Sequence, residues 1–301
     1  MYIKYMLSTL ILIITIQAER AQISGITLDT ASMLVLQGKN AEAGKLFLKR
    51  VHQMEDRNPD SLTKQERNLF FSNLYSLVCC YAKTGKPDSA LYFLKMLADR
   101  NYSHIELSAD VDLEPLQTYP SWQRSLDKIK ASFLLENRTV EDPEMAMELL
   151  EIQARDQSIR MNTQIPPERA RLMDENNKIR IGQIIDATGY PTAVRVGLTA
   201  SEVPVLILIH SDLSTQLKYL RAIKKSVRHK ELNGEYLGIL TDKIRIARGK
   251  PQLYGTQFRR DSLTGKNEAY PIKDLRHINK RRAALGFTIS FEEYKSFQES
   301  Y

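Results

Sequence analysis

The sequence predicts a mainly α-helical protein, with a short helical repeat region followed by a helical domain that carries a small β-hairpin. Apolar residues recur at helical spacing through most of the 301 residues. In the first half, two segments match in the positions of a glycine, an alanine and a large apolar residue, as in a repeat. Near the C-terminus, two short segments flank Thr264 and Gly265, which favours a hairpin turn.

Composition and charge are those of an ordinary folded protein. Hydrophobic residues make up 43% of the chain and charged residues 26%, which excludes an intrinsically disordered protein. The length suits about two domains. The net charge is +7, but basic and acidic residues are interspersed, and the densest basic clusters, 224–230 and 280–282, lack interleaved aromatic residues. We interpret both clusters as solvated helix faces and expect no nucleic-acid partner.

Residues 1–21 have the pattern of an export signal. Lys4 precedes an apolar run over 6–16, and the small residues Ala18 and Ala21 follow it. The run is too short to span a bilayer comfortably, so a cleaved signal peptide is favoured over a membrane anchor. We expect an exported protein, periplasmic or secreted, with no membrane span after the signal is removed.

Residues 22–132 are predicted to form a domain of two helical repeats. The matching positions are Gly38, Ala43 and Phe47 in the first copy, and Gly85, Ala90 and Leu94 in the second. The pattern resembles the tetratricopeptide repeat. The two glycines lie further apart than the roughly 34 residues of that repeat, which indicates an insertion around 57–67. The resemblance implies a packing scaffold or a concave surface for a protein partner.

Cys79 and Cys80 are the only cysteines in the chain. Adjacent cysteines form a disulfide only with strain, and both lie in an apolar helical pattern. We expect two buried thiols. Without a nearby histidine they do not make a metal ligand set, so no metal site is predicted.

The second domain, residues 140–301, is predicted to begin with a helix capped by Asp142. Its inner stripe would consist of Met147, Leu150, Ala154, Gln157 and Met161. Gln157 then interrupts an apolar face and needs hydrogen-bond partners. Two interpretations stay open: a satisfied glutamine beside an Asp156–Arg160 ion pair, or a polar cluster at the edge of a pocket.

A helix ending at Gly189 is followed by a second one that Ser201 can cap, with Pro204 in its first turn. Over 205–209 alone a strand is also possible, but the longer helical period favours a helix. Its core stripe would be Leu206, Ile209, Leu213, Leu217 and Leu220. His210 and Asp212 diverge on a continuous helix, so they pair only if the helix breaks between them.

The following helix is predicted to end at Gly249 and Pro251. Its inward positions are Leu237, Leu240, Ile244 and Ala247, with Asp242 and Lys243 on the flank. Beyond it, an extended chain would place Gln252, Tyr254, Thr256 and Phe258 on one face. Gly255 interrupts this segment, which suggests a bulge or a close approach by a ligand or another backbone.

Several motifs in residues 140–295 together resemble an uncharacterised bacterial domain family found in exported or repeat-linked proteins. They are Asp156, Gln157 and Arg160; Gly189, Pro191 and Thr192; His210 and Asp212; Asp242 with Lys243; and Gln252, Tyr254, Gly255, Thr256 and Gln257. Lys243 stands where that family has an arginine, which keeps the charge but loses bidentate geometry. The family has no established activity, so the resemblance implies a location for a site and no chemistry.

Three functions are compatible with these residues. One is a module that binds a small polar ligand through Gln157, Arg160, Asp242, Gln252, Tyr254, Gly255, Thr256 and Gln257. A second is a cell-envelope hydrolase or transferase in which His210 is the acid or base, oriented by Asp212 or Asp156. In the third, these polar residues satisfy one another inside a structural core. The sequence identifies no cofactor and does not decide whether the protein is an enzyme.

Overall fold

The computed structural model describes residues 29–55, 62–161, 165–261 and 265–299. These residues are mainly helical, with one two-stranded antiparallel sheet, so the predicted fold class is confirmed. The helices cluster into two compact units. The N-terminal unit runs to Thr139 and includes Leu150–Ser158, and the C-terminal unit contains Val140–Leu149 and the residues from Ile159 onward.

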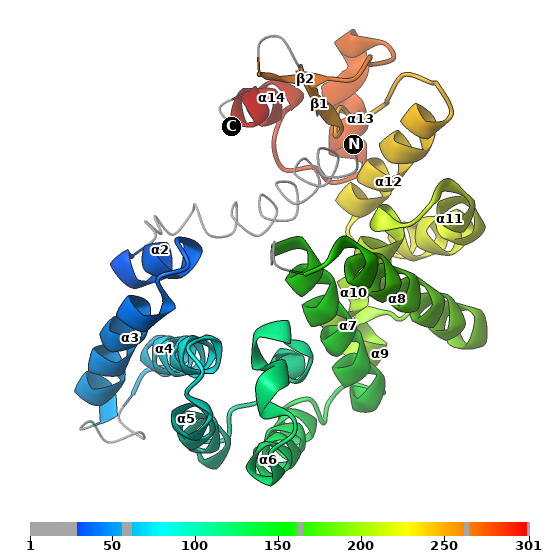
Figure 1. The fold of residues 1–301 in the computed structure, drawn as a ribbon. Coiled ribbons are helices and arrows are strands. Elements are labelled where there is room, and N and C mark those ends of the chain that lie inside the picture. The colour runs from blue at the N-terminus through cyan, green and yellow to red at the C-terminus, as the bar shows by residue number, and fades with distance from the viewer. Residues whose placement is uncertain (1–28, 56–61, 162–164, 262–264, 300–301) are drawn as a thin grey trace. The chain divides into compact units, whose positions relative to one another are not determined.

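The N-terminal unit is a succession of helices in which each α-helix packs against the next α-helix, and two 3-10 helices lie between the last two (Figure 1). They are α2 (Thr30–Leu36), α3 (Asn40–Glu55), α4 (Lys64–Lys83), α5 (Pro87–Asp99), the 3-10 helices η2 (Ile105–Ala109) and η3 (Val111–Leu116), and α6 (Pro120–Glu136). Gly38 and Gly85 both follow a helix with positive φ, +74° and +69°. The alanine and large apolar residue of each predicted copy are buried. Cys79 is half-buried and Cys80 buried, and both thiols are free.

The C-terminal unit contains the two ends of α7 (Pro143–Met161) and every later element. These are α8 (Pro167–Thr188), α9 (Ala193–Val196), α10 (Leu198–His210), α11 (Leu213–Arg228), α12 (Gly234–Ala247), β1 (Phe258–Arg260), β2 (Asn267–Ala269), η4 (Leu275–His277), α13 (Ile278–Ala284) and α14 (Phe291–Glu299). Helix α10 is the centre of this unit, because α8, α9, α11 and α12 all contact it. Its residues from Val203 to Ile209 are all buried.

The prediction of a single helix through residues 201–220 is wrong in two respects. The observed helix starts earlier than predicted, at Leu198, so Pro204 lies in the helix interior. It also breaks after His210, because Ser211 is extended and the Asp212 side chain accepts a hydrogen bond from the Thr215 backbone at 3.0 Å, capping α11. After the break the buried face rotates. Gln216, Tyr219, Ile223 and Ser226 are buried in place of the predicted leucines.

The inner faces of α7 and α12 also differ from the predictions. In α7 the buried residues are Ala146, Leu149, Leu150, Ile152, Asp156 and Ile159, so Asp156 is buried and Gln157 only half-buried. In α12, Asp242 is fully buried where a flanking position was predicted, and Ala247 is exposed. Periodicity of apolar residues misplaces a face whenever a carboxylate occupies an inward position.

The predicted hairpin is present. Phe258 pairs with Ala269 and Arg260 with Asn267 in antiparallel register. Gln252 forms a separate parallel bridge with Ile272, so the segment before β1 runs beside the segment after β2.

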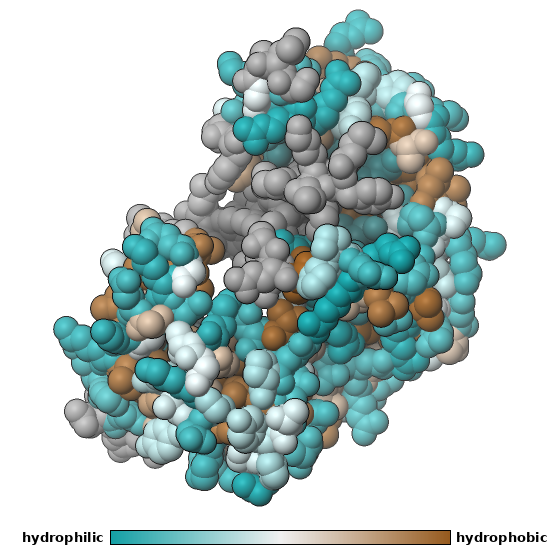
Figure 2. Space-filling model, in the orientation of Figure 1, coloured by the Kyte–Doolittle hydropathy of each residue, from teal (hydrophilic) through white to brown (hydrophobic). Residues whose placement is uncertain are grey.

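The visible surface of the described residues is mostly hydrophilic, with apolar residues scattered among polar ones (Figure 2). No helix in the described ranges has both the length and the apolar character needed to cross a bilayer.

Candidate functional site

The segment from Gln252 to Gln257 wraps around the carboxylate of Asp242. The backbone N–H groups of Leu253, Tyr254 and Thr256 donate to this carboxylate at 2.6–3.2 Å, and the Thr256 hydroxyl donates at 3.1 Å. Asp242 has no exposed surface. Burial raises the pKa of its carboxyl, and the donated hydrogen bonds act against that rise. Four donors from the loop thus converge on one buried side chain of α12.

Gln252 is also fully buried and connects three chain segments. Its Nε2 donates to the carbonyls of Gln257 and Tyr270, at 3.0 and 2.8 Å, and its Oε1 accepts from the Gln257 backbone at 2.9 Å. Its own backbone N–H donates to Pro271. Both amide hydrogens and the amide oxygen are therefore used inside the domain.

Three arginines hold carbonyl groups of the same loop or of Pro251, just before it. Arg245 donates to Pro251 at 2.6 Å, Arg281 to Leu253 at 2.8 Å, and Arg282 to Tyr254 at 2.8 Å. The prediction of a solvated face over 280–282 is wrong for Arg282, which is only 2% exposed. Its guanidinium lies 4.2 Å from the Phe287 ring centre and 5.4 Å from that of Tyr294.

A second polar cluster lies where α7, α8, α10 and α12 supply one residue each. Arg160 Nε donates to Nδ1 of His210 at 2.9 Å, and Arg160 Nη2 contacts Asp174 at 3.1 Å. The Arg160 side chain is only 6% exposed, whereas Asp174 is 44% exposed. Burial, together with the charge of Arg160, lowers the pKa of Lys243 to about 8. Two basic side chains and an imidazole thus share one largely buried cluster.

The profile of a family described as a family of unknown function, DUF6624, matches residues 143–301. That range is more than half of the chain. This chain belongs to the DUF6624 family. No curated protein and no solved structure matches the chain. The predicted uncharacterised family in the C-terminal region is thereby confirmed, while the repeat resemblance of the first half finds no match.

In this DUF6624 domain most of the predicted site residues belong to one of the two clusters. The first consists of Gln252, Tyr254, Gly255, Thr256 and Gln257 of the loop with Asp242 of α12, and its hydrogen bonds run to α12, to Tyr270 just after β2, to α13 and within the loop itself. Arg160 and His210 belong to the other cluster. Asp242 and Lys243 are neighbours on α12, and each serves a different cluster.

The helix break needed for a His210–Asp212 pair is present in the DUF6624 domain, but each side chain has other partners. His210 accepts from Arg160, and Asp212 caps α11 and accepts from Lys178 at 3.2 Å. Hydrogen bonds from Ser214 and from the Thr215 backbone hold the pKa of Asp212 far below its usual range. The geometry makes Asp212 a helix cap.

Asp156 and Gln157 precede Arg160 on α7, and Gln157 Nε2 donates to Asp156 at 3.3 Å. Asp156 is 2% exposed. A carboxylate buried to that degree requires hydrogen bonds or a charged partner. Because Asp156 lies one helical turn before Arg160, it stays a candidate site residue of the DUF6624 domain.

Sequence reasoning missed Asp174 and Arg282 and treated Lys243 only as a departure from the family pattern. For Arg282 a signal existed: it lies four residues after the apolar Ile278, on the same face of α13. Asp174 lies in a strongly charged helix, and nothing in its spacing distinguishes it from its neighbours. Contacts between distant segments decide its role.

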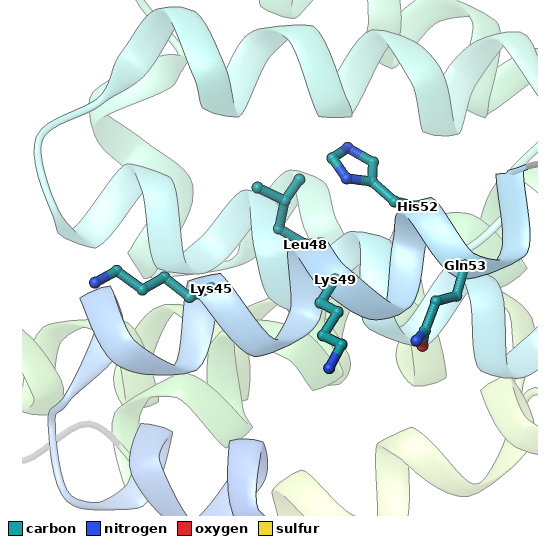
Figure 3. Close-up of a pocket in the computed structure, with 5 residues that line it drawn as sticks. All are labelled: Lys45, Leu48, Lys49, His52 and Gln53. Atoms are coloured by element: carbon teal, nitrogen blue, oxygen red, sulfur yellow. The ribbon is translucent and has the colours of Figure 1, made fainter.

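A hollow of about 590 Å³ lies along α3 in the N-terminal unit. Its lining residues are Lys45, Leu48, Lys49, His52 and Gln53 (Figure 3). All five come from one helix, and they point to different sides of it (Figure 3). Because a binding site gathers polar groups from several elements onto one ligand, we assign no site here.

Proposed function

We propose that the DUF6624 domain binds a small anionic ligand, carrying a carboxylate or phosphate group, through Arg160, Lys243 and His210. The observation that carries this proposal is the pair of neighbouring basic side chains in one largely buried cluster. Burial, and to a smaller degree the charge of Arg160, disfavours the protonated form of Lys243 and lowers its pKa. A bound anion would favour that protonated form and accept charge-assisted hydrogen bonds.

The hydrogen bond between Arg160 and His210 favours binding over acid–base catalysis. A guanidinium is always protonated, so it donates and His210 Nδ1 must accept. A neutral imidazole that accepts at Nδ1 carries its hydrogen on Nε2. In this state neither ring nitrogen has a lone pair available to remove a proton from a substrate. The alternative, a hydrolase or transferase using His210 with Asp156 or Asp212, therefore has less support than a binding role.

The loop has a structural role in this proposal. It fixes α12 against the C-terminal segment, and α12 carries Lys243. We further propose that the protein is exported and that the N-terminal helices form a tetratricopeptide-like scaffold for a protein partner. The sequence pattern of residues 1–21, which lie outside the described residues, supports export. The packed helix pairs with positive-φ glycines at Gly38 and Gly85 support the scaffold.

Calorimetric titration with succinate and inorganic phosphate tests the anion site. We expect Arg160→Gln and Lys243→Gln each to weaken binding by about tenfold or more, because each removes a charge-assisted contact. Lys243→Gln leaves the Arg160–His210 hydrogen bond in place, so it separates lost charge from lost packing. Arg171→Gln, at an exposed position of α8, is the matched control and should bind as the unmodified protein does. Unchanged binding in both site variants would rule out this site.

The pH dependence of binding follows from Lys243. Its pKa is about 8 in the free protein, and a bound anion raises it. Affinity should therefore be fully present below pH 8 and fall as the pH rises above 8, by at most about tenfold per pH unit. Titrations between pH 7 and 10 should show this decline, and the Lys243→Gln variant should lose it. A flat profile in the unmodified protein would show that Lys243 does not contact the anion.

A further inference from the structure

A second positively charged feature lies within the C-terminal unit, apart from the Arg160 cluster. The end of α8, the turn after it and one side of α11 enclose a groove of about 850 Å³. Its basic lining residues are Lys218, Arg221, Lys224, Lys225, Arg228 and His229. Two carboxylates, Asp186 and Glu231, also line it. Positive charge therefore predominates along the groove.

The carboxylates neutralise only the two ends of this basic row. Asp186 accepts from Lys218 at 2.8 Å and from the Tyr219 hydroxyl at 3.1 Å, and Glu231 lies 3.8 Å from His229 Nδ1. In the parts of the chain that the structure describes, no ion pair involves Arg221, Lys224, Lys225 or Arg228. Four cationic side chains thus face one hollow without a carboxylate partner among the described residues.

This arrangement disfavours the isolated helix. Arg221 with Lys225, and Lys224 with Arg228, are like-charged pairs four residues apart, and each destabilises a helix by a few tenths of a kcal/mol. The negative end of the helix dipole compensates cations in the last turn, here Lys225 and Arg228. It does not account for Arg221 and Lys224 further back, nor for a hollow between them and α8. An anionic ligand accounts for both.

We propose that this groove binds a chain of linked phosphate groups. Its cations recur at successive turns of α11, about 5.4 Å apart, so a linear polyanion can meet several at once. The two arginines can hold phosphate oxygens in bidentate fashion, and the lysines act as point charges. A flat anionic bilayer fits poorly because the cations line a hollow. A nucleic acid lacks stacking partners there, since Tyr190 and Tyr219 are 8% and 5% exposed.

Calorimetric titration with tripolyphosphate tests the groove. The double variant Arg221→Gln/Arg228→Gln removes two central cations, and we expect affinity to fall by about tenfold or more, with a shallower dependence on salt. The matched control, Arg171→Gln/Arg276→Gln, loses two exposed charges elsewhere and should bind within about twofold of the unmodified protein. Succinate binding, which reports on the Arg160 cluster, should not change in the groove variant Arg221→Gln/Arg228→Gln, and this separates the groove from the proposed anion site. Thermal unfolding of each variant confirms that it is folded.

Four results would overturn the proposal. One is the absence of tripolyphosphate binding to the unmodified protein. A second is an equal loss of affinity in the groove and control variants, which would indicate only nonspecific attraction to net charge. The third is equal or tighter binding of an oligoglutamate peptide of the same charge. The fourth is tighter binding to vesicles of phosphatidylcholine and phosphatidylglycerol, which would assign the groove to a membrane surface.

Discussion

Replacing Asp242 with asparagine is expected to lower the free energy of unfolding of the C-terminal unit by about 3 kcal/mol or more. The carboxylate accepts from three backbone N–H groups and one hydroxyl inside the core. An asparagine offers one oxygen and turns an NH₂ group toward the remaining donors, which leaves buried N–H groups without an acceptor. Urea unfolding of the full chain, followed by circular dichroism, measures the change.

Amide hydrogen exchange locates the effect of that substitution. The amides of Leu253, Tyr254 and Thr256 should lose protection first, because they donate directly to Asp242. Asp186→Asn is the control, since it makes the same chemical change at a solvent-exposed carboxylate of α8 and should alter stability little. If Asp242→Asn unfolded at the same urea concentration as the control, the carboxylate would not hold the loop.

The second large effect is expected for Gly255→Ala. Gly255 has φ +69°, and a Cβ atom there would lie 2.5 Å from the Phe291 ring and 2.9 Å from Ile278. Gly249 has a nearly equal φ of +67°, but a Cβ atom there would meet nothing within 4 Å. Gly249→Ala should therefore cost about 1–2 kcal/mol, from backbone strain alone. Gly255→Ala adds overpacking against Phe291, about 1–3 kcal/mol more.

Thermal or urea unfolding of the two alanine variants in parallel measures the difference. Both glycines have a left-handed backbone conformation. The difference between the two losses of unfolding free energy therefore isolates the steric contact with α14. Equal destabilisation of the two variants would mean that α14 shifts to accommodate the methyl group. A larger loss at Gly255 would show that the loop and α14 pack rigidly.

Much of this fold is predictable because local patterns and tertiary packing agree in it. Gly85, Ala90 and Leu94 lie where their spacing predicts. In the helical hairpin of α4 and α5, each helix buries one continuous apolar stripe. The hairpin near Gly265 and the helix end at Gly249 follow from turn chemistry within a few residues. These features depend on interactions close in sequence.

The features that escaped prediction depend on distant partners. The sequence pattern places Asp242 on the flank of α12, but the loop eleven to fourteen residues later supplies four donors to its carboxylate. The pattern likewise places Arg282 in solvent, but Phe287, Tyr294 and the Tyr254 carbonyl surround its guanidinium. The polar loop residues suggested a ligand pocket, because a sequence shows which groups can donate and accept but not that they satisfy one another. The charge of Arg160 acts on Lys243, which lies 83 positions away in the sequence, and residue spacing cannot reveal that proximity.

Gly238 and Phe287 should change together during the evolution of this family. A Cβ atom at Gly238 would lie 2.6 Å from the Phe287 ring, which also stacks on Tyr254 at 6.0 Å between ring centres. A relative with alanine at the first position therefore needs a smaller residue at the second, or a displaced ring. Such paired replacements in an alignment would reflect the close packing of α12 against the C-terminal segment. Either replacement alone should be rare.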